Sequence, residues 1–169
     1  MPADRDLTRA ILAGAVVLAA GAASAQVSIA PILGDHSVLQ RDQPIRVQGE
    51  AKAGESIRVT LARTVRTVRV DAKGRWSAEF PAMAAGGPHR LDAKASDGST
   101  AAADDVMIGD VWLCSGQSNM EYPLRRTLNA DSEVAAANDT DLRIVKIERN
   151  ATLDLAASFA KPPQWQAVT

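Results

Sequence analysis

The chain is poor in the residue types that most often build metal and redox sites. It has one cysteine in 169 residues, which excludes an intrachain disulfide framework and a cysteine-ligated zinc cluster. It has two histidines, His36 and His89, which leave little material for a histidine metal site or for a catalytic base. No metal site is therefore predicted from the composition.

Aromatic residues and net charge are also low. Aromatic residues make up 4% of the chain, and 19 basic against 20 acidic residues give a net charge of −1. Proteins that bind nucleic acids usually carry a basic surface or rows of aromatic side chains that stack on bases, so no nucleic-acid partner is predicted. The hydrophobic share of 46% supports one modest core or two thin ones and excludes disorder along the whole chain.

The first 25 residues have the pattern of an export signal. Two arginines precede an apolar run over residues 10–23, which is shorter than the ~20 residues that span a bilayer. Ala23-Ser24-Ala25 then gives a small–x–small cleavage pattern. We therefore expect residues 1–25 to be a signal peptide, the mature chain to start at Gln26, and the protein to be periplasmic or secreted with no membrane contact after cleavage. The alternative is a buried helix of the mature protein.

Residues 26–104 have the pattern of an all-β domain. The runs at 56–61 and 75–80 alternate apolar and polar residues, which places one face of each strand in a core. The residues expected in this core are Ile57, Val59, Leu61, Trp76, Ala78 and Phe80. Asp71-Ala72-Lys73-Gly74 predicts a tight hairpin between the runs at 65–70 and 75–80. Short strands with turn signals about every ten residues indicate a β-sandwich-like domain.

The pattern changes at residue 105. Residues 106–114 are almost continuously apolar, which is typical of a strand buried on both faces, so Trp112 and Cys114 are expected to be buried. The elements expected after this strand are helices at 119–128 and 131–138 and a strand at 142–147. This order of elements, a strand, a turn, a helix and then a further strand, indicates the first βαβ unit of an α/β domain that starts at residue 105.

Ser118 lies on the small polar turn between the expected strand and helix. Such a turn lifts a serine hydroxyl out of the sheet, and the first backbone N–H groups of the helix face any oxyanion that forms there. Gly116 lets the chain turn closely, and Ser118 then lies where an activated hydroxyl is needed. The alternative is that Ser118 only caps the helix.

Residues 110–121, with the sequence DVWLCSGQSNME, resemble the nucleophile block of the sialate O-acetylesterases, which belong to the SGNH group of serine ester hydrolases. Residues 32–41, ILGDHSVLQR, resemble the segment of that family that precedes its N-terminal β domain. Residues 71–76 and 85–88 also match the family's pattern and spacing. The resemblance covers roughly residues 27–169 in order.

The resemblance implies that Ser118 is the nucleophile and a backbone oxyanion donor, with Gly116, Gln117 and Asn119 forming the turn around it. The family's base is a histidine near the end of the catalytic domain, and neither it nor the family's later oxyanion donors can be matched here. Both histidines of this chain precede Ser118. We therefore expect residues 105–169 to be the incomplete start of an SGNH-type three-layer α/β hydrolase domain, and the 169-residue chain alone to be inactive.

The implied function is hydrolysis of O-acetyl esters on sialic acids or related sugars, with an O-acetylated sugar as the partner and with no metal or organic cofactor. Two alternatives stay open. The first is an acetyl esterase of plant-type polysaccharides, because relatives of that kind have the same turn motif. The second is a non-catalytic β-sandwich module joined to an inactive hydrolase remnant.

Overall fold

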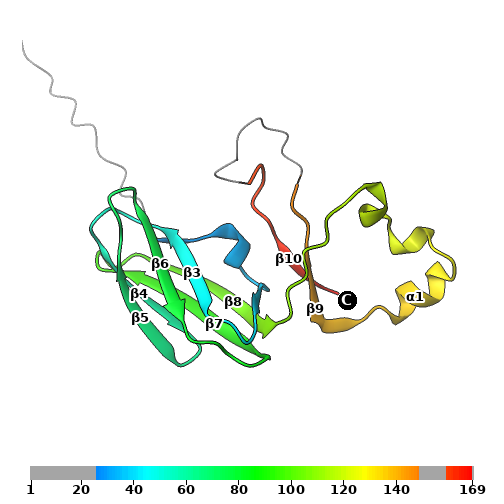
Figure 1. Ribbon diagram of the computed structural model, residues 1–169, viewed down its shortest axis with the longest axis horizontal. Coiled ribbons are helices and arrows are strands. Elements are labelled where there is room, and N and C mark those ends of the chain that lie inside the picture. Colours follow the sequence, from blue (N-terminus) through cyan, green and yellow to red (C-terminus); the bar gives the residue numbers. More distant parts are fainter. Residues whose placement is uncertain (1–25, 149–158, 169) are drawn as a thin grey trace, which may run out of the picture.

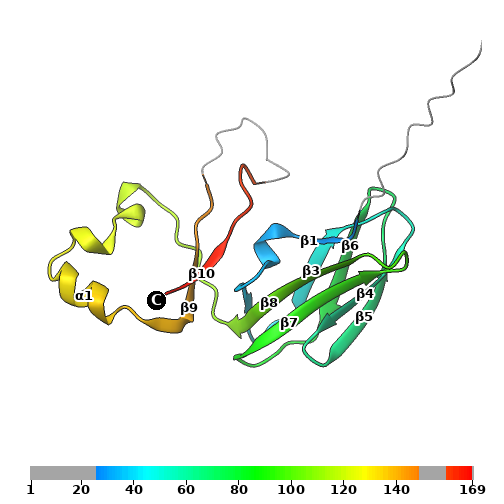
Figure 2. The same cartoon turned by 180° about the vertical axis from the view of Figure 1, so that it is seen from behind.

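The computed structural model describes residues 26–148 and 159–168. The expected signal peptide, residues 1–25, lies outside the described residues and stays a prediction. Residues 26–109 form a β-rich unit, called the β unit below. The remaining described residues, 110–148 and 159–168, form a second part that lies beside it in both views (Figures 1 and 2).

The β unit contains two sheets. The three-stranded sheet has the order β1 (Ser28–Ile29), β3 (Ile45–Glu50) and β6 (Arg75–Phe80). The five-stranded sheet has the order β2 (Val38–Gln40), β8 (Thr100–Gly109), β7 (Gly86–Ala95), β4 (Ser56–Leu61) and β5 (Thr64–Arg69). Strands β2 and β8 are parallel, and the other neighbours are antiparallel. A short 3-10 turn, η1 (Pro31–Leu33), lies between β1 and β2.

Both sheets contribute to one hydrophobic core. The six residues that alternation predicted to be buried are all buried: Ile57, Val59, Leu61, Trp76, Ala78 and Phe80. Strand β4 contributes the first three and strand β6 the other three, and all belong to a single cluster. Burial of each large side chain contributes roughly 1.5–3 kcal/mol, so this cluster is the main source of stability of a mostly-β chain with one mixed sheet.

The turn at Asp71–Gly74 forms, but it connects strands of different sheets. Gly74 has a φ of 79°, and its backbone N–H donates to the carbonyl of Asp71 over 3.0 Å. Strand β5 pairs with β4, whereas β6 pairs with β3. The expected hairpin between 65–70 and 75–80 is therefore wrong, because the turn directs the chain from one sheet to the other.

Strand β8 extends past the expected change of pattern at residue 105. It runs from Thr100 to Gly109, and Val106 and Ile108 are buried in the core of the β unit. The strand expected at 106–114 therefore ends at Gly109, because its partners are β2 and β7 of the same unit. The residues beyond it are not packed: Trp112 is 84% exposed and Cys114 is exposed, so the expected burial of both side chains is wrong.

The second part contains short elements. They are the 3-10 turns η2 (Ser118–Glu121) and η3 (Leu124–Arg126), the helix α1 (Ala130–Ala136), and the antiparallel strands β9 (Asp139–Val145) and β10 (Trp165–Val168). Two 3-10 turns replace the helix expected at 119–128, because Pro123 interrupts it. The partner of β9 is antiparallel β10, so the described residues contain no parallel βαβ pair. None of the described helices combines the length and apolar character needed to cross a bilayer.

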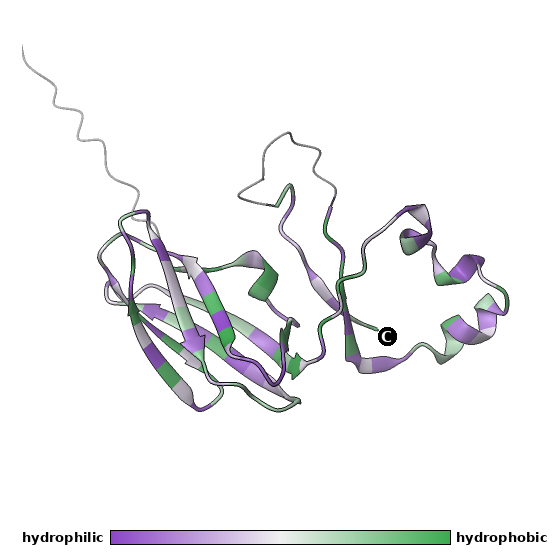
Figure 3. Cartoon of the chain, viewed as in Figure 1, coloured by the Kyte–Doolittle hydropathy of each residue, from purple (hydrophilic) through white to green (hydrophobic). Residues whose placement is uncertain are grey.

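Exposed large apolar side chains gather in the second part. Among the described residues, every large hydrophobic side chain that is exposed lies at or beyond residue 111, and Leu113 and Leu128 are each about nine-tenths exposed. Figure 3 shows these apolar stretches along the ribbon of the second part. Apolar surface of this extent on a soluble chain marks a face that another polypeptide covers, or a face prone to aggregation.

We expect residues 26–110 to be more soluble than residues 26–168. The shorter chain keeps all of β8 and the whole core, and it removes the exposed apolar side chains. Light scattering after size-exclusion chromatography and binding of an apolar dye measure the difference. A monomeric 26–168 chain that binds no dye would contradict this expectation. A chain cut at residue 104 serves as the control, and it should be unstable because it lacks Val106 and Ile108.

Candidate functional site

The backbone around Ser118 forms a tight, exposed turn. Gly116 has a φ of 155°, and a Cβ at this position would lie 3.0 Å from Cγ of Met120. Gln117 is extended, Ser118 begins η2, and the backbone N–H of Met120 donates to the carbonyl of Gln117 over 2.9 Å. The predicted turn residues Gly116, Gln117 and Asn119 are thus brought together around Ser118, all of them exposed.

No histidine serves Ser118 within the described residues. Nδ1 of His36 lies 2.7 Å from Oδ2 of Asp105, and His89 lies in β7 opposite Val106. Both histidines therefore belong to the β unit, as the sequence order predicted. A serine hydroxyl without a base in hydrogen-bond reach is a weak nucleophile.

The carboxylates near the turn are engaged with cations. Nε of Arg41 donates to Oδ1 of Asp110 over 2.9 Å, and this hydrogen bond is the main reason that the pKa of Asp110 lies below its usual range. Lys146 Nζ lies 3.3 Å from Oε1 of Glu121. Asp110 therefore stays ionised at neutral pH and is a poor proton donor.

The start of the Ser118 segment is fixed to strand β2 and the residue after it. The backbone N–H of Arg41 donates to the carbonyl of Gly109 over 2.9 Å, and Oε1 of Gln40 accepts from the backbone N–H of Val111 over 2.9 Å. With the Arg41–Asp110 ion pair, three contacts hold residues 109–111. Residues 32–41, which the resemblance singled out, therefore contact the beginning of the segment that carries Ser118.

The contacts of residues 109–111 with Gln40 and Arg41 form a first anchor between the Ser118 segment and the β unit. A second anchor joins β9 to the β unit, and the sequence did not predict it. Oδ2 of Asp105 accepts from Nδ1 of His36 and, over 3.0 Å, from Nη2 of Arg143 in β9. The hydrogen bond from His36, followed by the charge of Arg143, lowers the pKa of Asp105. No sequence signal links three residues this far apart, and an arginine in an alternating strand is expected on the solvent face.

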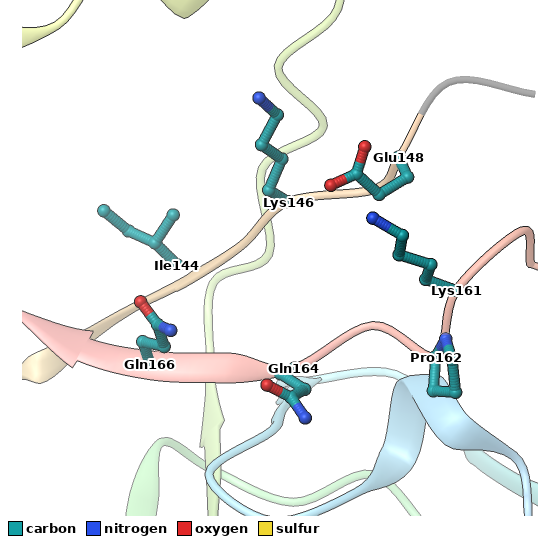
Figure 4. Close-up of a pocket in the computed structure, with 7 residues that line it drawn as sticks. All are labelled: Ile144, Lys146, Glu148, Lys161, Pro162, Gln164 and Gln166. Atoms are coloured by element: carbon teal, nitrogen blue, oxygen red, sulfur yellow. The ribbon is translucent and has the colours of Figure 1, made fainter.

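A hollow of about 490 Å³ lies beside β9 and β10 (Figure 4). Its lining residues are Ile144, Lys146, Glu148, Lys161, Pro162, Gln164 and Gln166. Figure 4 shows the side chains of Glu148 and Lys161 extending toward each other. The lining contains no nucleophilic hydroxyl or thiol, and Ser118 does not belong to it. Within residues 26–148 and 159–168, no group of three or more histidine, cysteine or carboxylate side chains could hold a metal ion.

Comparison with known proteins identifies relatives of the chain. No protein-family model matches it. It is 33% identical over 151 residues to a rat sialate O-acetylesterase, covering 79% of this chain and 28% of the relative. It is 31% identical over 116 residues to the mouse sialate O-acetylesterase, covering 63% of this chain and 21% of the relative.

A solved structure is similar in fold. The crystal structure of a carbohydrate acetylesterase from Xanthomonas citri matches with a TM-score of 0.79 and 38% sequence identity, covering 83% of this chain and 32% of that one. The chain thus spans less than a third of the length of each of these relatives. Over the region that these comparisons cover, the chain is similar to sialate O-acetylesterases and to a carbohydrate acetylesterase.

Proposed function

We propose that this chain is part of an exported serine esterase that removes O-acetyl groups from sialic acids or related sugars. The observation that carries the proposal is the exposed Ser118 on a tight glycine turn, in a chain whose relatives are sialate and carbohydrate acetylesterases. An O-acetylated sugar is the partner, and neither a metal nor an organic cofactor takes part in the proposed reaction.

The proposed reaction has two steps. Oγ of Ser118 attacks the acetyl carbonyl carbon while a base removes its proton, and backbone N–H groups, including that of Ser118, stabilise the oxyanion. The sugar oxygen then leaves with that proton, and an acetyl ester of Ser118 forms. Water attacks this ester in the second step, releases acetate and restores the serine. The base is a histidine other than His36 and His89, because both lie in the β unit.

Further polypeptide of a longer protein supplies that histidine in this proposal. We infer that the β unit is the β-sandwich-like domain and that the second part belongs to an SGNH-type three-layer α/β hydrolase domain. The exposed apolar side chains from residue 111 onward support this inference, because such a domain would cover them with further elements. The short coverage of the relatives is consistent with it.

A chimera tests the function. Residues 26–168 replace the matched region of the Xanthomonas citri carbohydrate acetylesterase, whose remaining chain then completes the catalytic domain. We expect the chimera to release acetate from O-acetylated sialic acid. Acetylated xylan is tested as a second substrate. The similarity to a carbohydrate acetylesterase makes other acetylated carbohydrates candidate substrates as well. A folded chimera that acts on neither substrate would contradict the proposal.

Export is a separate proposal with its own test. We propose that the apolar run before Ala23-Ser24-Ala25 directs the chain out of the cytoplasm. Expressed in a bacterium with its native leader, the protein should be recovered from the periplasm with Gln26 as its first residue, as measured by N-terminal sequencing. Ala25→Lys is the control, which should block cleavage. Soluble cytoplasmic protein that keeps Met1 would contradict the proposal.

A further inference from the structure

The segment that carries Ser118 leaves the β unit and returns to it at neighbouring points. It starts after Gly109, where Gln40 and Arg41 hold residues 110 and 111. It ends in β9, where Arg143 contacts Asp105 of β8, whose other partner is His36. Figure 1 shows the turns and α1 projecting away from the β unit between these two anchors.

The anchor at β9 rests on a buried charge. The side chain of Arg143 is only 5% exposed, and its Nη2 donates to Asp105 over 3.0 Å. Nε and Nη1 of Arg143 are buried and have no hydrogen-bond partner among the described residues. The carboxylate of Asp105 thus balances the charge of the buried Arg143 guanidinium. Removing that carboxylate would leave a buried charge without a partner, which lowers the stability of the contact.

The backbone is arranged to bring these groups together. His36 and Asp105 both have a positive φ, 62° and 54°, which is uncommon for residues other than glycine and persists when the surroundings enforce it. The backbone N–H of His36 donates to the carbonyl of Asp104 over 3.0 Å. A further contact supports the same hairpin, since Nε1 of Trp165 in β10 donates to the carbonyl of Ile32 over 2.9 Å.

We propose that Asp105 is a positioning residue that, with His36, holds Arg143 and the β9–β10 hairpin on the β unit and thereby fixes the segment that carries Ser118. The β unit is then more than a spacer, because it sets where both ends of that segment lie. The effect on activity rests on the proposed function, whereas the attachment of the hairpin does not.

Hydrogen exchange of residues 26–168 tests the attachment. Asp105→Asn keeps the shape of the side chain, tolerates a positive φ and removes the charge. We expect amides of β9 and β10 to exchange about tenfold faster or more, while amides of β3, β4 and β6 keep their protection. The matched control is Asp104→Asn, because the neighbouring carboxylate contacts Arg90 instead, over 2.6 Å. This control should leave β9 and β10 unchanged.

A second variant separates the anchor from general destabilisation. In an Arg143→Met background the buried charge is gone, so Asp105→Asn should have little further effect on β9 and β10. Equal effects of Asp105→Asn and Asp104→Asn, or an equal increase of exchange in all strands, would overturn the attachment.

The chimera tests the effect on Ser118. Asp105→Asn should lower kcat on an O-acetylated substrate about tenfold or more with little change in KM, and Asp104→Asn should not. Faster exchange in β9 with unchanged kcat would overturn the positioning role. A folded but inactive unmodified chimera would reject the proposed function and leave the exchange result as the test of the anchor.

Discussion

Ser118→Ala should lower kcat/KM of the chimera on O-acetylated sialic acid by about a thousandfold or more, as removal of a serine nucleophile does in other hydrolases. Without Oγ no acetyl-enzyme can form, and only the oxyanion donors and substrate binding persist. Initial rates of acetate release give the ratio. Ser115→Ala is the matched control, because Ser115 is an exposed serine of the same segment, and it should keep activity within about threefold of the unmodified chimera.

The 26–168 chain by itself gives the complementary result. It should hydrolyse nitrophenyl acetate no faster than its own Ser118→Ala variant, because both histidines lie in the β unit and His36 is bound to Asp105. Ser118-dependent turnover by this chain would show that His36, His89 or a second copy supplies the base. Full activity of the Ser118→Ala chimera would place the nucleophile elsewhere.

Gly49→Ala should destabilise the β unit by about 3 kcal/mol or prevent its folding. A Cβ at residue 49 would lie 1.9 Å from the carbonyl oxygen of Ser28 and 2.6 Å from Cζ2 of Trp76. Neither neighbour can move freely, because β1 pairs with β3 at this point and Trp76 is buried in the core. Urea unfolding followed by tryptophan fluorescence measures the change in the free energy of unfolding.

Gly34→Ala is the control for this substitution. A Cβ there would approach only the carbonyl oxygen of Pro31, at 3.3 Å, and the φ of −72° suits an alanine. Its effect should stay within about 1 kcal/mol, since it also reduces the entropy of the unfolded chain. Equal free energies of unfolding for the two variants would show that β1 and Trp76 do not pack against Gly49 as described.

The strands of the β unit were predictable where one face is buried and the other is exposed to solvent. The alternation in β4 and β6 identified their core residues because the side-chain period of a strand is two. The pairing of the strands was not predictable. The hairpin between β4 and β5 turns at Ala62, whose φ is 52°, and alanine gives no signal for a left-handed turn.

The second part was less predictable, for a different reason. A continuous apolar run has no period that marks its end, so residues 106–114 gave no indication that β8 stops at Gly109. Strand β10 has only four residues, and it is set by its pairing with β9. The contact between Asp105 and Arg143 depends on how the chain returns to the β unit, which local sequence does not encode.

The turn around Ser118 was predictable from its motif, because Gly116 provides a backbone conformation that other residues rarely adopt. The expectation of a long helix after it was wrong, since Pro123 divides that stretch into 3-10 turns. The motif thus indicated the tight turn at Gly116 but not the length of the element that follows.

Covalent labelling of the chimera with a fluorophosphonate tests the role of Ser118 most directly. Such a probe forms a stable phosphonyl ester with an activated serine, and peptide mass spectrometry locates it. We expect a single labelled peptide that contains Ser118, labelling that increases in parallel with the loss of esterase activity, and no label in the Ser118→Ala variant. An active chimera labelled at a different residue, or inactivated without any label on Ser118, would contradict this expectation.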